Sequence, residues 1–143
     1  MRSVTFEVFG VPAPQGSKRH VGHGVMVESS KALPSWRDAV TWAARAAAQR
    51  YGVTAPLGGP LSLDVEFRFP MPKARPRAAR DAGRAWRTAT PDTDKLVRAV
   101  CDALTASGLI VDDARICEVS ARKVEVVGWT GAIITLICVG EVS

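Results

Sequence analysis

Apolar and polar residues alternate along two stretches of the 143-residue chain. Residues 4–9 read VTFEVF and residues 61–69 read LSLDVEFRF, with every second side chain apolar. A period of two is typical of a β-strand that buries one face and leaves the other in water. We therefore predict strands over both stretches, with Asp64 and Glu66 on the solvated face of the second.

Two other stretches carry apolar residues at the spacing of an amphipathic helix. The first follows a capping-box pattern of Ser35 and Asp38 and stops at Gly52, and the second spans about 95–107 and stops at Gly108. We predict a helix over each, with one face packed in the core. The core-facing residues are Trp36, Val40, Ala43, Ala44, Ala47 and Tyr51 in the first helix and Leu96, Val100, Ala103 and Leu104 in the second.

The last third of the chain predicts two strands, over 116–127 and 130–139, joined as a hairpin through 128–131. The first strand loses its alternation at Arg122 and Lys123, which indicates a bulge or a different register. The second is apolar on both faces, as in a central strand or one covered by a partner subunit.

The predicted order is strand, helix, strand, helix, strand, strand. We expect a mixed α/β (α+β) fold with one four-stranded sheet and two packed helices, in a single domain over residues 1–143. Residues 10–34 are rich in glycine and proline and lack a sustained period, so they predict a long loop with room for a short hairpin. The chain contains neither a glycine-rich phosphate loop nor a nucleophile elbow.

Composition is that of an ordinary soluble protein, with 47% hydrophobic and 23% charged residues. No apolar run approaches the roughly 18 residues of a membrane span, and the first residues lack the apolar core of a signal peptide. We therefore expect a cytoplasmic protein. Cys101, Cys117 and Cys138 are odd in number and widely spaced, which favours reduced, buried thiols over disulfides or a zinc site.

The positive charge is concentrated in residues 70–91, which hold six cations and one acid. Prolines disfavour regular structure there, so we predict a flexible basic arm, either simply solvated or gripping DNA phosphates with Trp86 available to stack on a base. Lys18 and Arg19 form a second cluster, with the same two interpretations. The cations of the arm are Lys73, Arg75, Arg77, Arg80, Arg84 and Arg87.

Acidic pairs flank the second helix: Asp92 and Asp94 precede it, and Asp112 and Asp113 follow it. A helix of about thirteen residues spans roughly 20 Å, so the two ends can meet only if the chain folds back after Gly108. The Thr-Pro sequence before the first pair favours extended backbone. We expect Asp92 just outside the helix and Asp94 at or near its N-cap.

Carboxylate oxygens without nearby sulfur suit Mg²⁺ or Mn²⁺, and a bound ion offsets the repulsion between clustered acids. Each acidic pair also has a simpler interpretation. Asp92 and Asp94 can cap the helix, Asp112 and Asp113 can form a polar turn, and Asp94 can pair with Arg98 one turn on. The nearby basic arm favours a metal and phosphate site.

The stretch PDTDKLVRAVCDALTASGLIVDDARI resembles the signature of the RusA-type Holliday junction resolvases, without gaps from Asp92 to Asp113. By this resemblance, Asp92, Asp94 and Asp113 fall on the family's metal-binding carboxylates. Arg98 stands in place of a catalytic lysine, and it can stabilise phosphate charge but is a poor proton donor. Lys95 stands where an asparagine is frequent and is a candidate phosphate contact.

The resemblance implies a homodimer with two active sites that resolves four-way DNA junctions by paired nicks in recombination and repair. The cofactor would be Mg²⁺, with Mn²⁺ as the alternative, and the source a bacterium or its phage. Two other interpretations stay open. The chain can be a nuclease for flaps or forks, or a non-catalytic DNA-binding protein whose acids only cap a helix.

Overall fold

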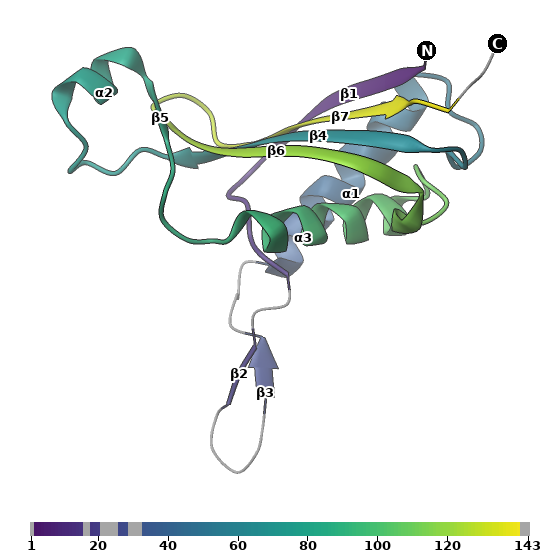
Figure 1. Cartoon of the computed structure of the whole chain (residues 1–143), viewed down its shortest axis with the longest axis horizontal. Coiled ribbons are helices and arrows are strands. Elements are labelled where there is room, and N and C mark those ends of the chain that lie inside the picture. The colour runs from purple at the N-terminus through teal and green to yellow at the C-terminus, as the bar shows by residue number, and fades with distance from the viewer. Residues whose placement is uncertain (1, 16–17, 21–25, 29–32, 141–143) are drawn as a thin grey trace.

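A computed structural model describes residues 2–15, 18–20, 26–28 and 33–140, with the backbone alone for 18–20, 26–28 and 33 (Figure 1). The elements are β1 (Ser3–Phe9), β2 (Lys18–His20), β3 (Met26–Glu28), α1 (Leu33–Arg50), β4 (Leu61–Pro70), α2 (Arg77–Ala82), β5 (Arg84–Trp86), α3 (Thr93–Ser107), the 3-10 turn η1 (Asp113–Arg115), β6 (Ile116–Val126) and β7 (Gly131–Cys138).

Five strands form one sheet in the order β1-β7-β4-β6-β5, in which β6 runs parallel to β4 and all other neighbours are antiparallel. Helices α1 and α3 contact each other and cover one face of this sheet (Figure 1). The mixed α+β class is confirmed. The predicted count of four strands is wrong, because the basic segment adds β5 at the edge beside β6.

Alternation and helical spacing identified most of the core, but the prediction for Tyr51 is wrong, because this residue follows α1 and is 42% exposed. The inward residues of β1 and β4 and the sheet-facing residues of α3 are almost fully buried, and each side chain larger than alanine contributes about 1.5–3 kcal/mol of hydrophobic stabilisation. This burial docks α3 across the sheet. The residues concerned are Val4, Phe6 and Val8 of β1, Leu61, Leu63, Val65 and Phe67 of β4, and Leu96, Val100, Ala103 and Leu104 of α3.

The hairpin predicted between the last two strands is wrong. β6 and β7 flank β4 on opposite sides, and the connection over 127–130 passes the end of β4. Arg68 of β4 holds this connection, since its Nε donates to the Trp129 carbonyl at 3.2 Å and its guanidinium lies 4.3 Å from the indole centroid. The predicted central position of β7 is confirmed, because β7 lies between β1 and β4.

Both helices begin earlier than predicted. α1 starts at Leu33, which places Ser35 inside the first turn and rules out the predicted capping box. α3 starts at Thr93 with Asp92 as its N-cap, so Asp94 lies in the first turn, near the cap as predicted. An acid in the first turn is still favourable there, because it faces the positive end of the helix dipole. The short hairpin allowed for in the long loop is found as β2 and β3.

The sheet face opposite the helices carries a charged cluster around Glu66. This carboxylate is only 6% exposed, so its assignment to a solvated face is wrong. It accepts hydrogen bonds from Arg84 at 2.6 Å, Arg68 at 3.0 Å and Arg122 at 3.1 Å. Arg122 also pairs with Asp64, which explains the lost alternation without a bulge at Arg122; the register shift lies at the start of β4. The Arg84 hydrogen bond is the main reason that the pKa of Glu66 falls from 4.5 to about 2.

A lowered carboxylate pKa stabilises the fold above the unfolded-state pKa, and this stabilisation is lost as pH falls through the folded-state value. We expect the free energy of unfolding to drop between about pH 4.5 and pH 2, and Glu66→Gln to flatten this drop. Urea titrations across that range measure it. Glu7→Gln, at an exposed position of β1, is the matched control. An unchanged pH slope in Glu66→Gln would contradict the role of this cluster.

Candidate functional site

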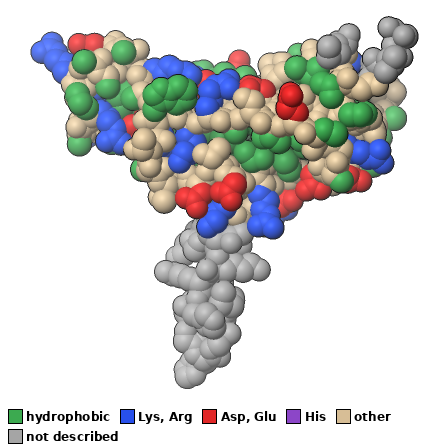
Figure 2. All heavy atoms as spheres, in the orientation of Figure 1, with side chains coloured by type: hydrophobic (Ala, Val, Ile, Leu, Met, Phe, Trp, Pro, Cys, Tyr) green, Lys and Arg blue, Asp and Glu red, His purple; other side chains and the backbone are tan. Residues whose placement is uncertain are grey.

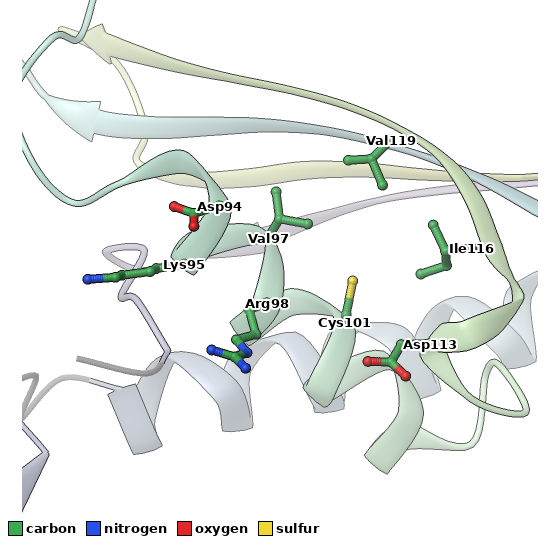
Figure 3. A pocket seen from close by; sticks show the side chains of 8 residues that line it. All are labelled: Asp94, Lys95, Val97, Arg98, Cys101, Asp113, Ile116 and Val119. Carbon is green, nitrogen blue, oxygen red and sulfur yellow. The ribbon is translucent and has the colours of Figure 1, made fainter. Parts of the chain in front are cut away.

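A hollow of about 330 Å³ lies between α3 and the start of β6. Figure 3 shows Asp94 and Asp113 at its two ends, the side chains of α3 between them, and the apolar side chains of β6 opposite. Acidic and basic side chains gather along the edge of the molecule that α3 forms (Figure 2). The lining residues are Asp94, Lys95, Val97, Arg98, Cys101, Asp113, Ile116 and Val119.

The helix places Asp94, Lys95 and Arg98 on its solvent-facing side because the opposite face is docked on the sheet. Asp94 and Arg98 are exposed and form no ion pair with each other, which rules out the simpler interpretation of this i, i+4 spacing. Arg98 forms no ion pair with any other described side chain. Both groups are therefore available to a ligand.

Asp92 lies next to this hollow but does not line it. Its backbone is extended and its side chain makes no capping hydrogen bond, so it sits just outside the helix as predicted. The Lys95 ammonium lies 3.7 Å from its carboxylate, which is exposed. The Asp92 carboxylate is thus committed to no more than one solvent-exposed contact of modest strength.

The chain folds back after α3, as the spacing required. Gly108 ends the helix at φ 80, and the backbone then pairs with Leu57, whose N–H donates to Leu109 at 2.9 Å and whose carbonyl accepts from Val111 at 3.0 Å. This pairing fixes the path to η1 and returns Asp113 to the side of α3.

The two acids of the second pair have different surroundings. Asp112 caps η1, since its Oδ1 accepts a hydrogen bond from the Ala114 N–H at 2.9 Å. Asp113 is exposed, points into the hollow and makes no ion pair among the described residues (Figure 3). The polar-turn interpretation therefore holds for Asp112, whereas Asp113 is free to bind a ligand.

Cys101 lies between the two ends of the hollow (Figure 3). Burial, with a further contribution from the charges of Asp113 and Asp102, raises the pKa of its thiol to about 11. The thiol therefore stays protonated and unreactive at neutral pH. Cys101 and Cys138 are buried as predicted, but Cys117 is exposed.

The carboxylates suit a hard divalent cation by their chemistry. Asp94 and Asp113 share one hollow, Asp92 adjoins it, and all three are exposed oxygen donors. Mg²⁺ commonly binds one or two carboxylates and completes its shell with water and phosphate oxygens. Within the described part of the chain, no group of three or more His, Cys, Asp or Glu side chains is already arranged around one point. The three carboxylates therefore do not form one ready ligand set in this structure.

Part of the basic segment is regular structure, in α2 and β5, whereas the sequence predicted a flexible arm. Its arginines reach two buried carboxylates that the sequence did not single out as acceptors: Arg84 binds Glu66, and Arg75 and Arg87 bind Glu125, which is 0% exposed. The Arg75 contact is bidentate at 2.6 and 2.9 Å, and these hydrogen bonds hold the pKa of Glu125 below its usual range. These three arginines were predicted to contact DNA, but their charge is largely compensated within the fold.

An outer group of cations remains exposed in this segment and comprises Lys73, Arg77 and Arg80. Arg77 lies 3.8 Å from Asp81, but the two side chains are 93% and 73% exposed, so this pair contributes little. Trp86 on β5 is 70% exposed. Basic side chains are visible around α2 and β5 in Figure 2. The side chains of Lys18 and Arg19 lie outside the described residues.

The model of the family Endodeoxyribonuclease RusA matches residues 9–136 of the chain. The chain belongs to the RusA family. No curated protein matches it. The predicted resemblance is thereby confirmed and extends over most of the chain. The hollow thus lies in a member of a DNA-cutting phosphodiester hydrolase family, on the stretch that first indicated the resemblance. The helices described for this RusA-family chain include none long and apolar enough to span a membrane.

The raised thiol pKa gives a direct test of where Asp113 lies. We expect Asp113→Asn to shift the alkylation of Cys101 to lower pH, because one of the negative charges that disfavour the thiolate is removed. Mass spectrometry after iodoacetamide labelling across pH measures the midpoint. Asp92→Asn is the control, since Asp92 does not contribute to this shift. Equal midpoints in wild type and Asp113→Asn would place Asp113 away from Cys101.

Proposed function

We propose that this RusA-family chain is a divalent-metal-dependent endonuclease that resolves four-way (Holliday) DNA junctions in recombination and repair. The observation that carries the proposal is the hollow that Asp94 and Asp113 share with Arg98. Two carboxylates from separate elements line it at its two ends, together with a guanidinium that no described acid neutralises. This combination can bind a metal ion and a phosphodiester together.

The carboxylates of Asp92, Asp94 and Asp113 would hold Mg²⁺ or Mn²⁺. Such an ion supplies a bound water of lowered pKa and offsets negative charge at the phosphate. Arg98 donates its fork of N–H groups to the phosphate oxygens. Because its guanidinium stays protonated, Arg98 stabilises developing charge and does not act as a general acid. Lys95 adds a second cation on the same side of α3.

The DNA backbone would lie along the outer cations Lys73, Arg77 and Arg80, with Trp86 available to stack on an unpaired base. Lys18 and Arg19 stay predictions for the same role. Arg75, Arg84 and Arg87 tie this segment to the sheet, because each is held by Glu66 or Glu125.

A homodimer is part of the proposal. A four-way junction has near two-fold symmetry, and a two-fold dimer presents two equivalent sites to it. Each site would then cut one of two strands of like polarity, giving paired nicks.

The decisive variant is Asp113→Asn, tested on synthetic four-way junctions with Mg²⁺ or with chelator. We expect junction binding to persist and cleavage to fall by roughly 100-fold or more, since even outer-shell partners of a metal cost about 10–100-fold. Asp102→Asn is the matched control, because Asp102 is on the same helix but does not line the hollow.

Unimpaired cleavage by Asp113→Asn would refute the site. Linear duplex cut as fast as the junction would refute the substrate assignment, and faster cutting of flaps or forks would favour those substrates instead. Junction binding without cleavage by the wild type would favour a non-catalytic DNA-binding protein.

The exposed cations of the basic segment predict a salt effect. Replacing Arg77 and Arg80 by Gln should weaken junction binding and reduce the slope of log affinity against log salt by about 2, since each phosphate contact contributes about 0.9. Arg45→Gln with Arg50→Gln, at exposed positions of α1, is the control of equal charge. Fluorescence anisotropy at several salt concentrations measures both. Equal slopes for the two double variants would mean that Arg77 and Arg80 are simply solvated and do not contact DNA phosphates.

A further inference from the structure

Three consecutive backbone carbonyls lie directly before Asp92, and each accepts a hydrogen bond from a cationic side chain. Lys123 Nζ donates to the carbonyls of Ala89 and Pro91, at 2.8 Å each. Arg87 donates to the carbonyl of Thr90 through Nε at 3.1 Å and Nη2 at 2.7 Å. The segment 89–91 is therefore clamped at every residue.

The Arg87 side of this clamp is itself fixed. Its Nη1 donates to the buried Glu125 at 3.1 Å, and its guanidinium lies 4.5 Å from the centroid of the Phe69 ring. Its backbone N–H donates to the carbonyl of Lys123 at 3.1 Å. Glu125 is held in turn by Arg75. The Arg87 guanidinium therefore links Glu125 of β6 to the Thr90 carbonyl, so the place of the segment depends on the place of β6.

The Lys123 side is an unusual use of an ammonium group. Lys123 pairs in register with the fully buried Phe67, so it projects from the helix-covered face of the sheet. None of the described acids lies within ion-pair distance of it, and two neutral carbonyls take its hydrogen bonds instead. Its neighbour Arg122 projects from the opposite face and pairs with Asp64 and Glu66.

We propose that Lys123 and Arg87 are positioning residues for the metal-binding end of α3. By fixing 89–91 they set where Asp92 begins the helix, and the Leu96 N–H then continues this path by donating to the Asp92 carbonyl at 3.1 Å. The carboxylate of Asp92, which has no capping hydrogen bond of its own, is thereby held beside Asp94. This inference rests on the proposed metal-dependent function and deepens it.

The clamp serves the site more than the fold. Thr88, Ala89 and Thr90 are exposed and bury no apolar side chain in the core. α3 is docked independently, by its own buried face. Loss of the Lys123 ammonium should therefore loosen the segment while α3 stays on the sheet.

Lys123→Met tests this, since it keeps the aliphatic stem and removes the ammonium. We expect Mn²⁺ affinity of the full chain, measured by electron paramagnetic resonance, to fall about 10–100-fold, as for other outer-shell partners of metal sites. The Leu96 amide should exchange with solvent faster, with or without metal. Lys123→Arg, which can still donate to both carbonyls, should restore both quantities. Arg87→Gln, a second variant that releases Thr90, should resemble Lys123→Met.

Arg122→Met is the control for loss of a cation from the same strand. It should keep wild-type Mn²⁺ affinity and Leu96 exchange even though it removes three hydrogen bonds. Wild-type Mn²⁺ affinity in both Lys123→Met and Arg87→Gln would overturn the inference, as would equal losses in Arg122→Met. If the wild type binds no Mn²⁺, the proposed metal site fails separately. The exchange rate of the Leu96 amide then tests the positioning role of Lys123, and an unchanged rate in Lys123→Met would overturn that role.

Discussion

The buried carboxylate of Glu125 joins the sheet, the basic segment and the loop that leads to the site. A carboxylate without solvent is costly unless cations and hydrogen bonds compensate it. Arg75 and Arg87 supply both the positive charge and the hydrogen bonds. Arg75 precedes α2 in the sequence and Arg87 follows β5, so both ends of this segment are bound to Glu125. These contacts tie the segment to β6, and its remaining cations are exposed to solvent.

This arrangement divides one run of like charge into two groups with different roles. The inner arginines turn inward to Glu66 and Glu125, where they replace water around an acid. The outer cations stay solvated, and their mutual repulsion is reduced because the inner group is neutralised. A basic segment held by such contacts loses less conformational entropy on binding a polyanion than a flexible arm would.

Periodicity sufficed for the elements with long, regular patterns. β1, β4, α1 and α3 were located, and four of the six buried residues of α3 were assigned to its core face. Strand pairing was not predictable in the same way. An apolar period of two is the same in a hairpin and in a parallel neighbour, so nothing local separated β6 beside β4 from β6 beside β7. β5 is too short to show a period at all.

The candidate site was predicted from spacing and family resemblance, whereas its supports were not. Asp94, Arg98 and Asp113 were named from the sequence and line one hollow. Glu66 and Glu125 looked like ordinary polar positions, because their burial depends on arginines most of which lie far away in the sequence. Lys123 carried one signal, the interrupted alternation of β6, but its partners are backbone carbonyls, and sequence does not reveal those.

The pairing of residue 57 with residues 109–111 has an evolutionary consequence. Asp94 and Asp113 belong to the two flanks of a single crossover between parallel strands, and the return path between them is fixed at the level of backbone hydrogen bonds. An insertion between Gly108 and Asp113 would displace one carboxylate while the other stayed in place. Length variation among related sequences should therefore be excluded from this interval and collect in the connection over 127–130, where an added residue moves neither acid.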